Sequence, residues 1–269
     1  MGTGIDTFEY VYGSTARREV LRTLAAGPRS RRSVVESCGS SESSVYDALN
    51  KLNRRGLIHQ RGDNEWTTTG AGRVVADVVE QCSAIDEVLA DEGYWASHDV
   101  SALPERFRRS IGSLEGYEVV RSPGPDPYRA NRTVAEAIRR ADRVGVMTPI
   151  YHDRFASALA DSDADTRRLL MAPAMVRRMD EGDHDPAGDD VVGIDARVGE
   201  FDLALTVTDD QVLLSLPTLD GTYDPETELV AESPAAVAWG AELFDLYWRD
   251  AEDVETLRSA REPRAEPSP

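Results

Sequence analysis

A helix, a glycine stop and a short hairpin follow one another within residues 41–72, and this order constrains the fold more than any other part of the chain. The segment from about Glu42 to Arg54 carries apolar residues at positions i, i+3, i+4 and i+7, which places them on one helical face. These residues are Val45, Ala48, Leu49 and Leu52. Ser40 or Ser41 can cap this segment and Gly56 can end it, so the sequence predicts a helix with one buried and one polar face.

Two short strands are expected directly after this helix. Residues 57–60 and 65–67 form the strands, and Gly62, Asp63 and Asn64 between them have the composition of a tight turn. Two further predicted helices precede the segment. The first covers residues 6–26 and ends at Gly27-Pro28, and the second covers residues 31–37, with Ser30 as its possible cap. Three helices followed by a hairpin predict a winged helix-turn-helix domain of the α+β class.

The next predicted helix, over about residues 71–91 with Thr69 as its cap, carries a regular apolar repeat. Val75, Val78, Cys82, Ile85 and Leu89 follow one another at spacings of 3, 4, 3 and 4, which is the pattern of a coiled-coil seam over two heptads. We therefore expect this helix to pair with a second copy in a homodimer. The alternative is a helix packed on its own domain, and the additional apolar residues Val74, Val79 and Val88 favour some packing of that kind.

The second half of the chain alternates between helical and extended patterns. Predicted helices cover residues 126–141, 152–160, 174–181 and 234–250, and predicted strands cover residues 144–148, 167–171, 190–195, 202–208 and 211–216. The segment LPERFRRSIGSL, residues 103–114, predicts an amphipathic helix with Pro104 at its first position. This alternation predicts an α/β domain with a mixed, partly parallel sheet.

Four regions follow from these patterns. We expect a winged-helix domain over residues 1–70, a linker or dimerisation helix over residues 71–92, an α/β effector or ligand-sensing domain over residues 93–258, and a disordered tail over residues 259–269.

Charge is divided unequally between these regions. The chain has 49 acidic and 30 basic residues, a formal net charge of −19, yet residues 1–75 carry a net charge of +3 and the remainder −22. A basic N-terminal segment in an acidic chain predicts a surface that approaches nucleic acid. Lys51 is the only lysine, and this composition resembles that of proteins from salt-loaded halophilic cytoplasms. The alternative is an acidic interaction surface on the C-terminal part.

The polar face of the helix at residues 42–54 offers groups suited to double-stranded DNA. Ser43, Ser44 and Tyr46 lie in its first half, which usually enters the groove most deeply, so we expect them to contact bases. Further candidates lie in the second half of this helix, at the start of the preceding helix and at the hairpin tip. We expect them to contact the DNA backbone or the minor groove, and they are Asn50, Lys51, Arg54, Arg29, Arg31, Arg32 and Arg61. The alternative use of such a surface is binding of another protein.

Several stretches resemble a known group of regulators. SSVYDALNKLNRRGLIHQRGDNEWTTTGAG resembles the winged helix of archaeal transcription regulators. SHDVSALPERFRRSIGSLEGYEVVRS and ADRVGVMTPIYHDRF resemble the effector domain first named in archaeal methanogenesis and filament regulators, and more distantly the sugar-responsive TrmB-type regulators. The resemblance covers nearly the whole chain. It implies a dimeric transcription regulator with a C-terminal domain that can sense a ligand.

The C-terminal part carries no recognisable catalytic motif. It has no GxSxG, GxGxxG, P-loop, HExxH or His-x-Lys pattern, so we expect no enzyme activity and no cofactor. Cys38 and Cys82 are too few and too far apart for a disulfide framework or a zinc site. We expect two reduced core cysteines and no bound metal.

A ligand site is more plausible than an active site. Thr148, Tyr151 and His152 lie just beyond a predicted strand and open a predicted helix, where ligands of α/β sheets gather. Arg132 and Arg178 are further candidates for contacts to a small-molecule effector. The alternative is a capped turn with a packed tyrosine and no ligand.

The sequence also predicts the location of the protein. The N-terminal segment has neither the basic start nor the apolar stretch of a secretory signal, the myristoylation pattern fails at Asp6, and no long apolar run occurs. We therefore expect a cytoplasmic protein without a membrane partner. The expected function is a DNA-binding transcription regulator, and the alternative is a winged-helix interaction module that reads no DNA.

Overall fold

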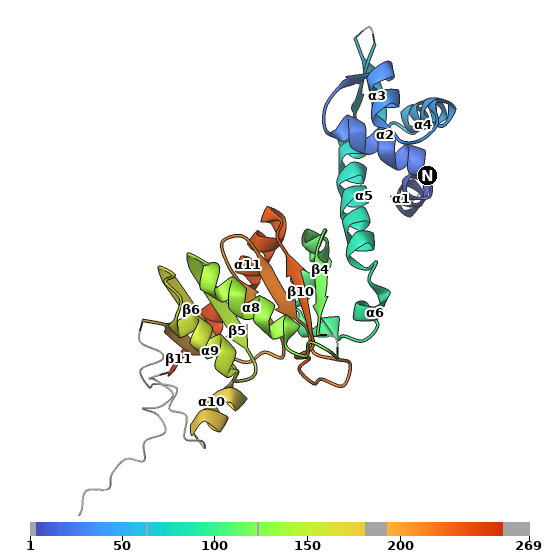
Figure 1. The fold of residues 1–269 in the computed structure, drawn as a ribbon. Helices are drawn as coiled ribbons and strands as arrows, with labels where there is room; N and C mark the ends of the chain where they lie inside the picture. The colour runs from blue at the N-terminus through green and yellow to red at the C-terminus, as the bar shows by residue number, and fades with distance from the viewer. Residues whose placement is uncertain (1–3, 63, 123, 181–192, 255–269) are drawn as a thin grey trace, which may run out of the picture. The chain divides into compact units, whose positions relative to one another are not determined.

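The computed structural model describes residues 4–62, 64–122, 124–180 and 193–254, and Figure 1 shows its helices and strands. The chain divides into two compact units, Met1–Asp86 and Glu87–Pro269.

Four helices build the first part of the N-terminal unit. They are α1 (Gly4–Tyr12), α2 (Thr15–Ala25), α3 (Arg31–Ser37) and α4 (Glu42–Arg54). The prediction of one helix over residues 6–26 is wrong, because the chain is extended at Ser14, with φ −145° and ψ 117°. Gly13 and Ser14 both have poor helix propensity, and serine prefers the position before a helix, so a second helix begins there.

The helices α3 and α4 have the bounds that the sequence predicts. The Ser30 hydroxyl accepts a hydrogen bond from the Ser33 amide at 3.2 Å, and Ser41 does the same for the Ser44 amide at 3.4 Å. Ser41 rather than Ser40 is therefore the cap of α4. Gly56 has a φ of +70°, the left-handed conformation that a glycine adopts freely after the last turn of a helix.

A three-stranded sheet completes the winged helix. It contains β1 (Arg29–Ser30), β2 (Ile58–Arg61) and β3 (Glu65–Thr68) in the order β1-β3-β2. The predicted hairpin is confirmed, although its first strand begins at Ile58 because the Leu57 amide still bonds the Leu52 carbonyl at 3.0 Å. The strand β1 is not predicted from sequence. It pairs Arg29 with Trp66 and so attaches the segment before α3 to the hairpin.

The apolar face predicted for α4 is the one that the unit buries. Val45, Leu49 and Leu52 are fully buried and Ala48 is 1% exposed, in a core shared with α2, α3 and the sheet. Burial of each large aliphatic side chain contributes about 1.5–3 kcal/mol. This packing fixes the rotation of α4 about its axis and turns its polar face outward.

The helix α5 (Gly70–Val88) follows the hairpin. The Thr69 hydroxyl accepts a hydrogen bond from the Gly72 amide at 3.0 Å, so the predicted cap is confirmed. The first turn of α5 packs closely on the start of the hairpin, since a Cβ atom at position 72 would lie 1.8 Å from the Leu57 carbonyl oxygen. Ala76 and Val79 then bury the same side of the helix in the core of the unit.

One eight-stranded sheet organises the C-terminal unit, in the order β11-β7-β6-β5-β8-β9-β10-β4. The strands are β4 (Glu118–Arg121), β5 (Arg143–Thr148), β6 (Thr166–Met171), β7 (Asp195–Val198), β8 (Ala204–Val207), β9 (Val212–Ser215), β10 (Thr227–Ala231) and β11 (Glu252–Asp253). The three strands β5, β6 and β7 run parallel and the other neighbours are antiparallel. The predicted mixed, partly parallel sheet is therefore confirmed.

Helices cover both faces of this sheet (Figure 1). On one face, α8 (Arg129–Arg140) and α9 (Asp153–Ala160) pack on apolar residues of β5 and β9. On the other face, α11 (Pro234–Asp250) lies so close that Cβ atoms at Gly145 and Gly240 would meet Phe244 and Val212. The shorter helices of the unit are α6 (Glu92–Trp95), α7 (Glu105–Arg109), α10 (Pro173–Asp180) and the 3-10 turns Val100–Ala102 and Ile111–Leu114.

Three sequence predictions need correction in this unit. The single helix over residues 103–114 is instead α7 followed by a 3-10 turn, with Pro104 before the first helical residue and a break at Ser110, where φ is −105° and ψ 19°. The strand predicted at 190–195 begins at Asp195, after Gly193 with a φ of +83°, and residues 190–192 lie outside the described residues. The strands β4, β10 and β11 were not predicted, and the predicted tail at 259–269 lies outside the described residues.

Candidate nucleic-acid interface and candidate effector site

The predicted DNA-contacting residues of α4 share its outward face. Ser43, Ser44, Asn50 and Arg54 are exposed, and Tyr46 and Lys51 are half-buried. The opposite face of α4 is fully packed in the core, so this orientation is not free to change without unfolding the unit. The helix can therefore present six polar side chains to a groove.

A cluster of hydroxyl groups occupies the first turn of α4. The Ser41 oxygen lies 2.9 Å from the Ser44 hydroxyl and 3.2 Å from the Ser43 hydroxyl. Hydroxyls both donate and accept, and the amide groups at the start of a helix favour an anion. The sequence identified Ser41 only as a cap, and its contacts with Ser43 and Ser44 place it within the same candidate surface.

Tyr46 and Arg31 together connect three elements of the candidate interface. The Tyr46 hydroxyl donates to Glu42 Oε1 at 2.8 Å, and this hydrogen bond raises the pKa of the tyrosine. The Arg31 guanidinium lies 5.2 Å from the centre of the Tyr46 ring and 5.9 Å from that of Trp66. Arg31 thereby holds the start of α3, the middle of α4 and the strand β3 in one arrangement.

Two of the candidate cations form ion pairs within their own helices. Lys51 Nζ lies 2.7 Å from Asp47 Oδ2, and Arg32 Nε lies 2.8 Å from Glu36 Oε1. Such exposed pairs contribute little to stability, so a phosphate can replace the carboxylate at small cost. Lys51 and Arg32 are held near the surface and remain available for exchange.

The remaining candidate arginines are less restrained. Among the described residues, no carboxylate forms an ion pair with Arg29, Arg54 or Arg61, and all three are exposed. Arg55 and Arg17, by contrast, lie over the ring of Tyr10 at 3.7 and 4.1 Å, on the body of the unit. The outward arginines are thus those of β1, the end of α4 and the hairpin, which are the positions that the sequence singled out.

The apolar residues of α5, together with Leu89 directly after its last residue, differ in their exposure. Val79 is fully buried in its own unit and Ala76 is 3% exposed, whereas Val78 is 40% and Leu89 46% exposed. The other predicted seam residues, Val75, Cys82 and Ile85, are half-buried. Val75 packs against the core of its own unit, so the predicted seam overlaps in part with the face that packs on the unit.

Contacts with α1 and α2 fix the position of α5 within the N-terminal unit. Arg22 Nε lies 2.5 Å from Glu80 Oε2, and the Tyr12 hydroxyl donates to Asp86. This hydrogen bond is the main reason why the pKa of Tyr12 is raised to about 12. The exposed strip of α5 is consequently held at a defined angle to α1 and α2.

In the C-terminal unit, the three neighbouring candidates for an effector site lie in one turn between β5 and α9. The Thr148 hydroxyl donates to the Ile150 carbonyl at 2.7 Å, and His152 Nδ1 accepts from the Arg154 amide at 3.2 Å. Burial, and then Arg154, lower the pKa of His152, whose ring stacks on Phe155. Tyr151 packs against an apolar cluster of β6, α10 and β7. These are the contacts of a capped turn, the alternative that the sequence left open.

The two candidate arginines lie elsewhere. Arg132, in α8, binds Asp126 through both of its terminal nitrogens, at 2.7 and 2.5 Å. Arg178 lies in α10, and its side chain is outside the described residues. Among the described contacts, none joins Arg132 to the turn after β5.

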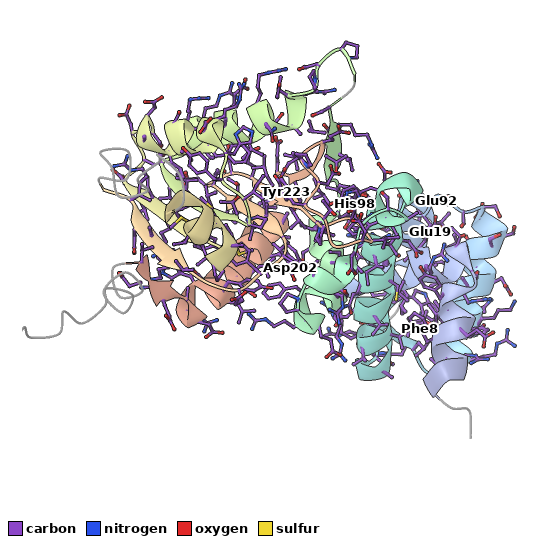
Figure 2. All side chains as sticks on the ribbon, turned by 90° about the horizontal axis from the view of Figure 1, so that it is seen from below. Phe8, Glu19, Glu92, His98, Asp202 and Tyr223 are labelled. Carbon is purple, nitrogen blue, oxygen red and sulfur yellow. The ribbon has the colours of Figure 1, made fainter. Side chains whose placement is uncertain are left out.

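A buried polar cluster that the sequence did not predict lies near β10. His98, only 5% exposed, places Nδ1 2.8 Å from the Tyr94 carbonyl and Nε2 3.0 Å from Asp224 Oδ2. Burial opposes ionisation of Asp224, but hydrogen bonds from Thr227, the Glu226 amide and His98 hold its pKa below the ordinary value. Figure 2 labels His98 and Tyr223 in this part of the unit.

This cluster does not have the geometry of a catalytic triad. The Ser97 hydroxyl lies 3.1 Å from His98 Nδ1 but also donates to the carbonyls of Gly93 and Tyr94. His98 Nδ1 in turn faces the Tyr94 carbonyl, so it is engaged with an acceptor rather than poised to take a proton from Ser97. The arrangement fixes α6 to the loop before β10.

Cysteine and metal chemistry add no further site in the described part of the chain. Both cysteines are free and half-buried, and Cys38 packs against the core of the N-terminal unit. Cys38 lies 3.9 Å from the Thr23 hydroxyl, and burial raises the pKa of its thiol. No group of three or more potential metal ligands occurs among the described residues, and none of their helices has both the length and the apolar character to cross a membrane.

Two protein-family models match separate parts of the chain. Residues 5–88 match the HVO_A0261 N-terminal domain, and residues 127–250 match the middle domain of the methanogenesis regulatory protein FilR1. The chain is 23% identical to FilR1 of Methanothrix harundinacea (strain 6Ac) over 268 residues. That match covers 86% of this chain but only 55% of the relative, so the chain corresponds to about half of that protein.

Solved structures provide more distant matches. The archaeal chromatin protein TrmBL2 is 17% identical in sequence to this chain. The match covers 94% of this chain and 100% of the TrmBL2 chain, with a TM-score of 0.40. YodB from B. subtilis is 16% identical in sequence to this chain. The match covers 32% of this chain and 97% of the YodB chain, with a TM-score of 0.29.

Proposed function

We propose that this chain, a regulator of the FilR1 type by its two matched domains, binds double-stranded DNA through α4 and regulates transcription. It acts as a homodimer through α5, and its C-terminal unit responds to a small molecule.

One observation carries the proposal for DNA binding. The helix α4 buries an apolar face and presents a hydroxyl cluster at its start, with Lys51 and Arg54 in its last turn. Arg31 lies over Tyr46 of this helix, and Arg29 and Arg61 lie on the three-stranded sheet of the same unit. A recognition helix needs this combination, because short hydroxyl and amide groups can read base edges while cations on either side bind phosphates.

The family matches support a role in transcription. The relative FilR1 is described as a methanogenesis regulatory protein, and the matched middle domain carries its name. Because the chain spans 55% of that relative, the activity of the whole relative is extended here only as a proposal.

The charge distribution fits the same proposal. The net charge of +3 in residues 1–75 contrasts with −22 in the remainder, so the first segment can approach DNA with less repulsion. In a salt-loaded cytoplasm the screening length falls to about 3 Å at about 1 M salt. The acidic unit would then repel DNA little, and short-range contacts from Ser43, Ser44 and Tyr46 would carry more of the binding.

A dimer through α5 is supported by its exposed apolar strip. Val78 and Leu89 belong to the seam of predicted a and d positions and remain 40% and 46% exposed. A second copy of α5 would cover them, and two winged helices would then contact two half-sites on the DNA.

Binding of DNA is tested by mapping the chromosomal sites that the protein occupies in living cells. The proposal predicts a limited set of sites that share a sequence pattern, and these sites are lost when Lys51 and Arg54 are both replaced by alanine. The matched control replaces Arg139 and Arg140 on α8 of the C-terminal unit, which leaves the basic surface of α4 unchanged.

The second candidate is a winged-helix module that binds a protein and reads no DNA. The ion pairs of Lys51 with Asp47 and Arg32 with Glu36 favour it, because they partly neutralise the surface in the free chain. Two results together would favour this candidate. The chromosomal sites that the protein occupies would share no sequence pattern, and the purified protein would bind none of the corresponding DNA fragments.

A further inference from the structure

A hollow of about 400 Å³ lies beside α11, over the first residues of the parallel strands β5 and β6. Its lining combines an apolar wall from α11 and the end of β8 with a polar rim from β5 and β6. An apolar wall with a few polar groups is the usual lining of a small-molecule site. We refer to this hollow as the flank pocket, and its main lining residues are Val207, Val237, Phe244, Arg143, Thr166 and Arg168.

Strand register places the polar rim on the face of the sheet that α11 covers. Arg168 in β6 and Val207 in β8 both pair with Gly145 of β5. A Cβ atom at Gly145 would meet the ring of Phe244 in α11 at 3.0 Å, so this row of the sheet faces α11. Residues two apart in a strand share a face, and Arg143, two residues before Gly145, therefore faces the same way.

Thr166 lies next to both arginines of the rim. It pairs with Arg143 across the two strands and precedes Arg168 by two residues in its own strand. The side chain of Thr166 is exposed, and a hydroxyl can donate to an anion that the neighbouring guanidinium groups attract. Two cations and one hydroxyl are thus grouped by the pairing of β5 with β6.

Arg143 is held in place through only one edge of its guanidinium. Its Nε lies 2.9 Å from Asp209 Oδ1, and Asp209 Oδ2 accepts from the amides of Asp142 and Arg143 at 2.8 and 3.0 Å. Among the described hydrogen bonds, none uses the terminal nitrogens of Arg143. These nitrogens can therefore donate to a ligand while Asp209 fixes the direction of the side chain.

Arg168 is positioned by an aromatic ring more than by a carboxylate. Its guanidinium lies 5.5 Å from the centre of the Trp248 ring. Its Nη1 lies 3.5 Å from Asp245 Oδ1, which exceeds the usual upper distance of about 3.2 Å for a hydrogen bond. A guanidinium stacked on a ring keeps its N–H groups at its edge, so Arg168 can exchange Asp245 for another anion.

The surroundings of the flank pocket are rich in arginine although the unit is acidic. A neighbouring hollow shares two of its residues and is lined by Arg106, Arg168, Glu242, Asp245 and Arg249. Among the described carboxylates, none forms an ion pair with Arg106 or Arg249. The two hollows bring four arginines close to three carboxylates, whereas the chain after position 75 carries a net charge of −22. A local excess of positive charge in an acidic unit favours an anionic ligand.

We propose that the flank pocket is the effector site of the C-terminal unit and that it binds a small carboxylic acid with a compact apolar group. The carboxylate is held by the guanidinium groups of Arg143 and Arg168, and the Thr166 hydroxyl donates to it. It replaces Asp245 as the partner of Arg168. The apolar group of the ligand lies against Val237 and Phe244.

The charge and shape of the pocket fit a monovalent anion better than a phosphate. Asp209 and Asp245 already balance the two guanidinium groups of the rim, so a doubly charged anion would meet more repulsion than a singly charged one. A carboxylate also matches the planar fork of an arginine. The apolar wall removes an aromatic ring or a branched chain from water, which a phosphate cannot use.

The flank pocket is separate from the turn at Thr148 and His152, because it lies at the start of β5 and the turn follows its end. The inference rests on the proposed effector role of the C-terminal unit but not on DNA binding, which is measured in a separate assay. Failure of one can therefore be recognised without failure of the other.

The experiment titrates the full chain by calorimetry with sodium benzoate, phenylacetate and 3-methylbutanoate. Sodium chloride at equal ionic strength, sodium phosphate and benzyl alcohol control for salt, for an anion without an apolar body and for an apolar body without charge. The carboxylates should bind at a single site per chain, and the controls should not. At a carboxylate concentration about 100-fold above Kd, the melting temperature of the C-terminal unit should rise by roughly 5–10 °C.

Substitutions locate the binding in the flank pocket. Arg168→Ala should raise Kd at least about tenfold, because a charge-assisted hydrogen bond is lost. Ala241→Leu should have a similar effect by filling the apolar side, and it leaves both guanidinium groups in place. Arg139→Ala, an exposed arginine of α8 on the other face of the sheet, should leave Kd unchanged. Ala241→Leu keeps the test valid where Arg168→Ala unfolds through loss of its contact with Trp248.

Equal binding of phosphate or benzyl alcohol, no binding of any carboxylate, or an unchanged Kd in folded Ala241→Leu would each overturn the proposal. The effector role is measured by fluorescence anisotropy of the DNA complex with and without benzoate. The DNA affinity should change by about fivefold or more, and an unchanged affinity in a chain that binds benzoate would overturn the role as effector site. A chain that binds benzoate in this pocket but no DNA would support the pocket and contradict the proposed DNA binding alone.

Discussion

The guanidinium of Arg31 lies 5.2 Å from the centre of the Tyr46 ring, so the first residue of α3 is stacked on the middle of α4. Both side chains lie on the polar surface proposed to face DNA, and Tyr46 is also bonded to Glu42. The contact therefore links a phosphate-binding candidate to a base-reading candidate.

Replacing Arg31 by alanine should weaken binding to all DNA sequences by a similar factor, about 5- to 30-fold at moderate salt. The slope of log affinity against log salt should fall by about one, because one phosphate contact is lost. Fluorescence anisotropy over a salt series measures both quantities. Arg139→Ala, on the C-terminal unit, is the control, and an unchanged slope in Arg31→Ala would show that Arg31 touches no phosphate.

Ser41→Ala should destabilise the N-terminal unit by about 1 kcal/mol, since it removes the cap of α4. Ser43→Ala is a matched control, because Ser43 is an exposed hydroxyl in the same turn that caps nothing. Urea unfolding of each variant gives the free energy of unfolding. Equal destabilisation by the two substitutions would mean that Ser41 is not the cap.

Gly72→Ala should destabilise the same unit by about 2 kcal/mol or more, because the added Cβ would lie 1.8 Å from the Leu57 carbonyl oxygen. Gly70→Ala, two residues earlier in the same helix, meets nothing within 4 Å and should change stability by less than about 1 kcal/mol. The comparison by urea unfolding tests the packing of α5 on the hairpin. Similar effects of the two substitutions would contradict it.

Val78→Glu should dissociate the proposed dimer by placing a charge in the α5 seam, with dimer Kd raised at least about tenfold. Val74→Glu is the control, since Val74 is 65% exposed and lies outside the repeat of a and d positions. Analytical ultracentrifugation over a concentration series measures the effect. A wild-type chain that sediments as a monomer at working concentrations would remove the seam proposal altogether.

The buried carboxyl of Glu228 should make stability fall as pH rises. Its pKa is raised in the folded chain, so its contribution is fully present below the ordinary value of 4.5 and is lost as pH rises through the folded value. Glu228→Gln should remove this part of the pH dependence and leave the acid side, which includes the depressed pKa of Asp224, unchanged. Unfolding curves of both proteins from pH 4 to pH 9 provide the test, and parallel curves would contradict it.

The sequence predicted α4 to the residue because three independent signals agree there: a serine cap, an apolar repeat and a glycine stop at Gly56. The same reasoning failed over residues 6–26, where one helix was predicted through Gly13 and Ser14 but the backbone is extended at Ser14. The strand β1 has only two residues, too few to show any alternation. It exists because Arg29 pairs with Trp66, a contact between distant positions.

The burial of Glu228 could not be predicted for a related reason. Glu228 reads as a polar residue in an ordinary loop or strand, but it lies in β10 between β4 and β9, which come from other parts of the sequence. The turn at Thr148 and His152 was predicted as a candidate site because it follows a strand and opens a helix. The structure shows capping contacts at that turn, which the sequence left open as the alternative to a ligand site.

The most direct test of the central claim is the equilibrium binding of the purified chain to the DNA fragments that it occupies in cells, measured against salt. DNA recognition by α4 predicts a linear loss of log affinity with log salt, a lower slope in Lys51→Ala, and an altered sequence preference with little change of slope in Ser44→Ala. Absence of binding to any of these fragments at every salt concentration, under conditions in which an unrelated DNA-binding regulator binds its own site, would contradict the claim.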